Sequence, residues 1–280
     1  KGSVTGGEFT GSVAGYNKGT IKNVGSAADV KGFRRAGGLV GVNEGRIENS
    51  YSKGSLTATG EYSGGVAGVN SGVIYGTYNF GKVNSSVNYA GGLTGQNQST
   101  GNISYSFNHG EVVTQGQYVG GIAGVNAGTI QIAYNTADVS GNKYAGGLVS
   151  TNSGTISNAY HSGQVMAPSN SGGIASANIG TLDRVYYNTS ETDRILPDAP
   201  YLRITSAVYG MSDSDTVKGL TLDQITGLEA IGPDTMDFDI SIWALKEGYD
   251  FISYFPELIY FRNHETGTIR DDSLISVTDK

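Results

Sequence analysis

The sequence repeats one glycine-rich stretch seven times, and this repetition constrains the fold more than any other feature. The copy at residues 36–47 reads Ala-Gly-Gly-Leu-Val-Gly-Val-Asn-Glu-Gly-Arg-Ile. Copies recur every 26 to 29 residues, and their leading glycines are Gly11, Gly37, Gly64, Gly91, Gly120, Gly146 and Gly172. A period in this range is typical of a solenoid, whose units bury their apolar faces only against their neighbours. The sequence therefore predicts a stack of seven similar units.

Each repeat reads as strands and turns, because short runs of alternating or β-branched residues are separated by Gly and Asn. Four columns of like residues recur at equivalent places. An aliphatic column after the glycines comprises Val13, Leu39, Val66, Leu93, Ile122, Leu148 and Ile174, and a second comprises Ile21, Ile47, Ile74, Ile103, Ile130, Ile156 and Leu182. An aromatic column comprises Tyr51, Tyr78, Phe107, Tyr134, Tyr160 and Tyr186, and a closing column comprises Val30, Leu56, Val83, Val112, Val139 and Val165.

These columns predict an all-β, right-handed parallel β-helix of about seven coils, with three strands per turn. The hand follows the general preference of crossovers between parallel strands. Seven coils at the usual strand spacing would be roughly 34 Å long. A β-propeller needs longer repeats, and a leucine-rich repeat needs a Leu pattern that the chain lacks.

One asparagine stands at the same place in all seven copies. Asn tolerates the left-handed backbone of a sharp corner, and its amide both donates and accepts hydrogen bonds. Stacked about 4.8 Å apart, identical amides form a ladder along the axis. We therefore interpret the column as structural; it comprises Asn17, Asn43, Asn70, Asn97, Asn126, Asn152 and Asn178.

The repeat pattern stops after Asn188, which predicts a β-helix over residues 1–190 and a small mixed cap over 191–280. A solenoid end exposes unpaired strands and open core, which a terminal element must cover. In the second part we expect a short helix from Leu222 and strands within 240–245, 251–255 and 258–261.

Composition excludes several classes of partner. A net charge of -7 and an isoelectric point near 4.9 argue against a nucleic-acid backbone or an anionic membrane as the main partner. Without cysteine, disulfides and Cys-based zinc sites are excluded. No apolar run is long enough to span a bilayer, and no signal peptide opens the chain. We expect the chain to be a segment of a longer protein.

The Gly-Gly-aliphatic-x-Gly-x-Asn core, followed by Gly-x-Ile, resembles the GLUG repeat. The resemblance covers about residues 9–188, and the stretches 237–243 and 254–258 also resemble what often follows such repeats. GLUG repeats occur in secreted and cell-surface bacterial proteins, including the N-terminal regions of streptococcal immunoglobulin A1 metallopeptidases and large filamentous adhesins. The resemblance thus implies an extracellular or cell-surface bacterial protein.

The peptidase chemistry of that first group needs His-Glu-x-x-His on a helix, where two His residues bind zinc and the Glu activates water. Here the only histidines are His109, His161 and His264, and none has that spacing. We therefore expect no metal, no cofactor and no peptidase site in this segment. The acidic groups 213–215 and 234–239 match no calcium loop, and turn or capping roles are expected for them.

A tyrosine column stands just before the glycines, in what reads as a variable loop. It comprises Tyr62, Tyr89, Tyr118 and Tyr144, preceded by Arg35 in the coil below. Aromatic faces are common platforms for sugar rings, so the column is a candidate ligand-binding strip. In the alternative interpretation the rings stack on one another, capped by a cation–π contact from Arg35, and serve only stability.

A polar column precedes the closing aliphatic residues and comprises Asp29, Ser55, Lys82, Glu111, Asp138 and Gln164. Glu111 and Asp138 would lie about 5 Å apart, a spacing found in retaining glycosidases. The competing interpretation is a solvated face on which Lys82 pairs with Glu111.

Two functional hypotheses follow. The preferred one is a non-catalytic structural or binding module of a large bacterial surface or secreted protein, which adheres to host or cell-wall glycans or glycoproteins or displays other domains of the same polypeptide. The alternative is a carbohydrate-active β-helix, a polysaccharide lyase or glycoside hydrolase, that uses Glu111 and Asp138.

Overall fold

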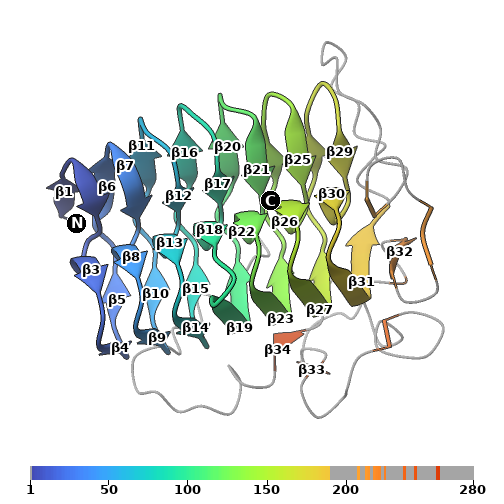
Figure 1. The fold of residues 1–280 in the computed structure, drawn as a ribbon, viewed down its shortest axis with the longest axis horizontal. Helices are drawn as coiled ribbons and strands as arrows, with labels where there is room; N and C mark the ends of the chain where they lie inside the picture. Colours follow the sequence, from blue (N-terminus) through green and yellow to red (C-terminus); the bar gives the residue numbers. More distant parts are fainter. Residues whose placement is uncertain are drawn as a thin grey trace, which may run out of the picture.

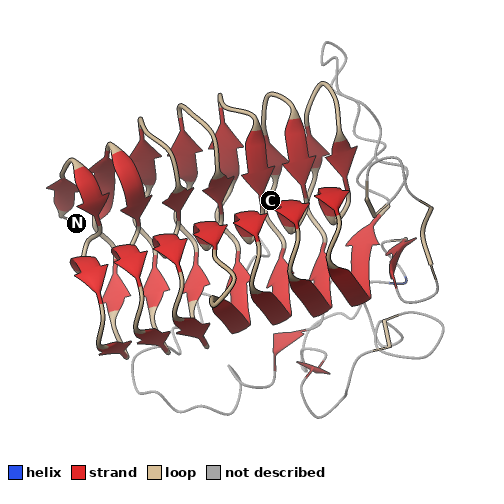
Figure 2. Ribbon diagram, viewed as in Figure 1, coloured by secondary structure: helices blue, strands red, loops and turns tan. Residues whose placement is uncertain are grey.

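The chain winds into a β-solenoid whose coils stack along one axis, as the computed structural model shows (Figure 1). The structure describes residues 2–189 and short pieces of the remainder: 207–208, 212–214, 217–221, 224, 236–237, 243–244 and 257–258. Strands and loops make up the stack (Figure 2). No helix in the described part of the chain has the length and apolar character needed to cross a membrane.

Four parallel sheets run along the axis, and each coil contributes to all four in chain order. Sheet A consists of β1 (Ser3–Thr5), β6 (Asp29–Gly32), β11 (Leu56–Ala58), β16 (Val83–Ser85), β20 (Val112–Thr114), β24 (Val139–Ser140) and β28 (Val165–Met166). Sheet B consists of β2 (Glu8–Thr10), β7 (Arg34–Gly37), β12 (Ser63–Gly64), β17 (Ala90–Gly91), β21 (Tyr118–Gly120), β25 (Tyr144–Gly146) and β29 (Ser171–Gly172).

Sheets C and D complete each coil. Sheet C consists of β3 (Ala14–Asn17), β8 (Val40–Asn43), β13 (Ala67–Asn70), β18 (Thr94–Asn97), β22 (Ala123–Asn126), β26 (Val149–Asn152) and β30 (Ala175–Asn178). Sheet D consists of β4 (Thr20–Lys22), β9 (Arg46–Glu48), β14 (Val73–Tyr75), β19 (Asn102–Asn108), β23 (Thr129–Asn135), β27 (Thr155–His161), β31 (Thr181–Asn188) and β32 (Val217–Leu220), with β5 (Gly25–Ser26), β10 (Tyr51–Ser52) and β15 (Tyr78–Asn79) beside them in the first coils.

The seven-coil solenoid is confirmed, but the expected three strands per turn is wrong, because each coil has four sheets. The additional sheet is B, whose strands carry small inward residues such as Ala36, Ser63 and Ala90, all fully buried. In the sequence these residues read as part of the glycine turn, so they carry no strand signal.

The core is built from in-register columns of like residues. Ile47 pairs with Ile74, and Leu56 pairs with Val30 and Val83, in parallel ladders. Both aliphatic columns and the closing column are almost completely buried from the second coil onward, except for Leu182, which is partly buried. Like residues therefore stack on like residues, as the sequence predicts.

The aromatic column forms a second stack on sheet D. Successive rings from Tyr51 to Tyr160 have centroids 5.3, 4.9, 4.8 and 5.2 Å apart, all nearly parallel. The first coil has Gly25 at this place, and a Cβ there would lie 2.2 Å from the Tyr51 ring. The rings from Tyr78 to Tyr160 are buried and Tyr51 is half-buried, so the stack serves packing.

Several described residues beyond 206 lie against the last coil. β32 extends sheet D beside β31, and Val208 bridges to Ala175. Ala207, Val208 and Leu220 are buried, the first two within the main core cluster. β33 (Trp243–Ala244) pairs antiparallel with β34 (Glu257–Leu258), within or beside two of the expected strands. The expected strand within 251–255 lies outside the described residues, as does the expected helix from Leu222 apart from Gln224.

Candidate functional site

The tyrosine column lies where the expected loop meets the sheet B strands. Tyr118 and Tyr144 are the first residues of β21 and β25, whereas Tyr62 and Tyr89 directly precede β12 and β17. Arg35 lies within β7. We call the four tyrosines the tyrosine strip. All four are half-buried, so the strip forms part of the outer surface.

The rings of the tyrosine strip stack on one another. The centroid distances are 5.0 Å for Tyr62–Tyr89, 5.0 Å for Tyr89–Tyr118 and 4.9 Å for Tyr118–Tyr144, with interplanar angles of 9°, 13° and 19°. Their faces are therefore turned mainly toward each other. Such a stack leaves ring edges and hydroxyls, rather than open faces, to meet a ligand.

The expected cation–π cap is at a different ring. The Arg35 guanidinium lies 5.2 Å from the ring centroid of Phe9, which occupies the equivalent place in the first coil. At the other end, Lys143 Nζ lies 4.7 Å from the centroid of Tyr144. The strip is thus bounded by Arg35 on one side and a lysine on the other.

Three hydroxyls of the strip are available for an external partner, whereas Tyr144 hydrogen-bonds to Lys143. Among the residues the structure describes, no side chain hydrogen-bonds to the hydroxyl of Tyr62, Tyr89 or Tyr118. Burial raises the pKa of Tyr89 above its usual value, and the neighbouring phenols of Tyr62 and Tyr118 add to this. The Tyr89 phenol therefore stays neutral at physiological pH and keeps both its donor and its acceptor.

The third glycine of each motif makes room for the strip. Arg35, Tyr62 and Tyr89 have positive φ angles of 51°, 66° and 68°, which bend the backbone at this place. A Cβ on Gly95 would lie 2.6 Å from the Tyr62 backbone, and one on Gly68 would lie 2.5 Å from that of Arg35. Hence the repeated glycine and the tyrosine strip are parts of one local arrangement.

Glu111 and Asp138 each have a separate partner. Glu111 forms an ion pair of 2.8 Å with Lys82 of the preceding coil, and its side chain is about half exposed. An Asp138 carboxylate oxygen accepts a hydrogen bond of 2.9 Å from the backbone nitrogen of Gln164 in the following coil. Asp29 makes the same bond to Ser55. The two acids are directed to neighbours on opposite sides, an arrangement typical of a solvated structural face.

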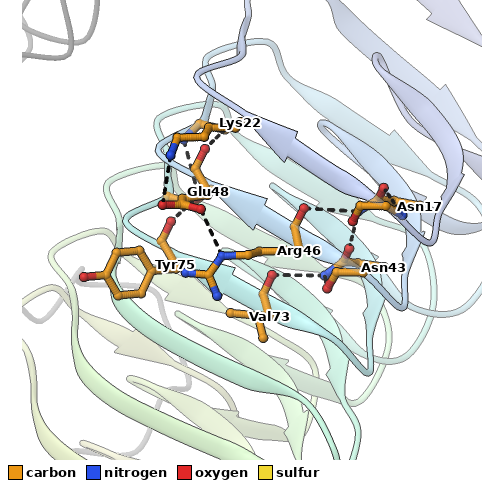
Figure 3. A network of polar contacts seen from close by, with 11 residues as sticks. Asn17, Lys22, Asn43, Arg46, Glu48, Val73 and Tyr75 are labelled. Carbon is orange, nitrogen blue, oxygen red and sulfur yellow. Dashed lines mark hydrogen bonds and ion pairs between the residues drawn. The ribbon is translucent and has the colours of Figure 1, made fainter.

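The asparagine column forms a continuous ladder, which we call the corner ladder. Each Nδ2 donates to the Oδ1 of the next residue along Asn17, Asn43, Asn70, Asn97, Asn126, Asn152 and Asn178, at 2.7 to 2.8 Å. Figure 3 shows its first step, where Asn17 and Asn43 also reach the backbone carbonyls of Arg46 and Val73. The ladder thereby joins sheets C and D at their shared corner.

A second ladder lies within the stack and was not foreseen from the sequence. Asn79 donates to Asn108 at 2.9 Å, Asn108 donates to Asn135 at 2.8 Å, and Asn135 Nδ2 lies 2.9 Å from Nδ1 of His161. These side chains are buried beside the second glycine of each Gly-Gly pair. Their common place directly after the aromatic column is the signal that would have found them.

The side chains of this column become larger from the second coil to the last. In register they are Ser52, Asn79, Asn108, Asn135, His161 and Tyr187. Burial lowers the pKa of His161 to about 4, so the imidazole is neutral. Its Nδ1 lies 2.9 Å from the side-chain nitrogen and 3.2 Å from the backbone carbonyl oxygen of Asn135, so the imidazole continues the ladder.

A charged cluster stands beside the corner ladder (Figure 3). Arg46 Nε lies 2.9 Å and Lys22 Nζ 3.5 Å from the carboxylate of Glu48, and the Arg46 guanidinium lies 5.2 Å from the Tyr75 centroid. The hydrogen bond from Arg46 is the main cause that lowers the pKa of Glu48. Apart from the exposed Lys22 the cluster is half-buried, and it is internally paired at the surface, so it contributes little free energy.

The acidic group at 213–215 has a structural role where it is described. The Asp213 carboxylate accepts from the backbone nitrogens of Ala207 and Gly219 at 2.8 and 2.9 Å, and from the Tyr187 hydroxyl at 3.2 Å. Within the described residues, no three metal-ligating side chains come together. Asp234, Asp239 and His264 lie outside those residues.

These features define a class of protein: a parallel β-solenoid repeat module, held by polar ladders and carrying uniform columns on its surface. Residues 34–57 match the GLUG motif, a stretch that runs from β7 to β11. The matched stretch is one of the seven copies, and the other six copies repeat its pattern. No curated protein and no solved structure matches it.

Proposed function

We propose that the chain is a non-catalytic binding module of a larger bacterial surface or secreted protein, and that it adheres to glycans or glycoproteins. In the same polypeptide it holds other domains away from the surface. The observation that supports the proposal is the tyrosine strip, in which four equivalent half-buried rings present their edges along one line.

A rigid scaffold supports this role. A weak contact to one side chain gains strength when it is repeated along a surface whose spacing does not change. The corner ladder and the buried columns fix that spacing over all seven coils. A repeating surface ligand can therefore make the same contact several times.

The test is binding to arrayed host and cell-wall glycans and glycoproteins. We expect the unmodified chain to bind, and the double variant Tyr89→Ala/Tyr118→Ala to lose most of that binding while remaining folded. Tyr75→Ala, which changes a half-buried tyrosine on sheet D, is the matched control. Binding that is equal in all three proteins would remove the strip from the proposal.

A polysaccharide-cleavage assay tests the proposal that the module is non-catalytic. We expect no turnover of acidic or neutral polysaccharides, because Glu111 and Asp138 are each held by a different structural partner. Turnover that is abolished by Glu111→Gln would contradict this and favour a carbohydrate-active enzyme.

A further inference from the structure

We propose that the ligand of the tyrosine strip is an extended, neutral β-1,4-linked glycan that runs parallel to the solenoid axis, with one sugar ring on each coil. This inference rests on the proposed binding function and names its ligand class.

The first observation that supports this ligand is the distance between successive rings of the tyrosine strip. Successive ring centroids are 4.9 to 5.0 Å apart over Tyr62, Tyr89, Tyr118 and Tyr144. An extended β-1,4-linked glycan is nearly straight and advances by close to the same distance per sugar ring. A chain laid along the strip therefore places one sugar ring beside each tyrosine. Because alternate rings of such a chain are turned over by half a turn, the tyrosines meet its two edges in alternation.

The same spacing disfavours a peptide strand in this direction. Side chains on one face of an extended strand recur about every 6.7 Å, twice the rise per residue. Such a strand would lose register with the tyrosines within two coils. An α-1,4-linked glycan curves into a helix and leaves the line of the strip after few rings.

The chemistry of the strip indicates a neutral, hydroxyl-rich ligand. The stacked rings offer edges and phenol hydroxyls, and each hydroxyl can donate one hydrogen bond and accept others. The charged groups beside the strip are Lys143, which lies over the Tyr144 ring, and Glu61, which is ion-paired with Arg34, whereas the phenols themselves carry no charge. Sugar hydroxyls, which also donate and accept, complement such a row without a desolvated charge.

The length of the strip sets the length of the ligand. On one side the equivalent residue is Arg35, and on the other it is Asn170, directly before β29. Only four successive coils have tyrosine at this place. The site therefore holds four sugar rings.

Calorimetric titration with cello-oligosaccharides of two to seven rings tests the inference. We expect the association constant to rise with each ring up to four and then to level off. Malto-oligosaccharides of equal length are the linkage control, for which we expect at least tenfold weaker binding. An association constant that does not depend on chain length, or equal binding of both series, would overturn the proposal.

The double variant Tyr89→Phe/Tyr118→Phe removes two hydroxyls and keeps the ring stack. We expect about tenfold weaker binding of the four-ring ligand, the effect of two lost hydrogen bonds, with unchanged circular dichroism and melting temperature. Tyr75→Phe is the control and should bind normally. Unchanged binding by the double variant would contradict the assigned contacts.

Failure of this inference is distinguishable from failure of the proposed function. If cello-oligosaccharides do not bind but an arrayed glycoprotein binds and is lost in Tyr89→Ala/Tyr118→Ala, the binding function stands and the ligand class is wrong. If nothing binds through the strip, both are wrong.

Discussion

At the scale of single residues, the ladders show how this chain buries many polar side chains. An amide in the middle of a ladder donates a hydrogen bond to one neighbouring amide and accepts a hydrogen bond from the other. Asn43, Asn70, Asn97 and Asn126 are all fully buried in this way. Each such residue supports two others, so its loss has consequences beyond its own contacts.

Replacing Asn97 by Ala is therefore expected to destabilise the protein by about 1–3 kcal/mol, because a donor on Asn70 and an acceptor on Asn126 both lose their buried partner. Asn178 is the matched control, since it ends the ladder and is half-buried. Chemical denaturation measures both variants. Equal losses for Asn97→Ala and Asn178→Ala would show that the ladder is not cooperative.

His161 gives the stability a dependence on pH. Burial lowers its pKa from 6.5 to about 4 in the folded chain. The unfolded chain thus binds more protons between these values, so the free energy of unfolding falls as pH falls from 6.5 toward 4, by about 3 kcal/mol at most. His109 shifts in the same direction and adds to this loss.

His161→Asn isolates the contribution of this residue, because Asn stands at the equivalent place in the two preceding coils and continues the ladder. We expect the variant to lose stability less steeply between pH 6.5 and 4 and to keep the contribution of His109. Denaturation curves at several pH values measure the slope. An unchanged slope would show that His161 does not titrate with unfolding.

How much of the candidate site could be predicted depends on how regular the coils are. The corner ladder and the stacked strip follow from the sequence, because their residues recur at one offset in consecutive copies. The partner of Arg35 does not, since recognising Phe9 requires the register of the irregular first coil. The second ladder could not be predicted, because its column has asparagine only from Asn79 onward. Its three asparagines are therefore hard to tell from the many others in the sequence.

At the scale of elements, sheet C depends on its glycines. A Cβ on Gly95 would lie 2.6 Å from both the backbone nitrogen of Ser63 and the carbonyl carbon of Tyr62. At the equivalent place, Ser150 is accommodated, and its hydroxyl donates to the backbone carbonyl of Tyr144 at 2.9 Å. The coil cross-section therefore differs between the fourth and sixth coils.

Gly95→Ala is expected to destabilise the protein by about 1–3 kcal/mol, because the added methyl group displaces a packed backbone. Ser150→Ala keeps its Cβ and loses one hydrogen bond, and should cost about 1 kcal/mol. Thermal denaturation of the two variants measures the difference. A Gly95→Ala variant as stable as the original would mean that sheets B and C can separate at this corner.

Sheets A, C and D could be predicted because each carries a column of bulky or amide side chains that repeats with the coil. Sheet B could not, because its inward residues are small and stand beside glycines, which read as a turn. The right-handed sense of the coil stays a prediction from the general behaviour of parallel crossovers.

At the scale of the whole molecule, each coil bonds only to the coils before and after it. Stability in such a stack is close to a sum of coil terms and nearest-neighbour terms. Removing one whole coil should then leave a shorter protein that still folds.

Deletion of residues 65–91 joins Gly64 to Gly92 and removes one coil together with Tyr89. We expect a folded protein that is shorter by about 4.8 Å in small-angle scattering. Its affinity for cello-oligosaccharides should level off at three rings. A folded deletion protein that still levels off at four would contradict the assignment of one ring to each coil.

The graded column of the second ladder also bears on how such a chain changes over generations. Asn79, Asn108 and Asn135 are interchangeable, so unequal recombination between central repeats adds or removes a coil without leaving an amide unmatched. Ser52 at one side and His161 at the other are not interchangeable with their neighbours. An exchange in the centre of the stack therefore preserves the ladder, whereas an exchange at either end changes the partner of a buried side chain.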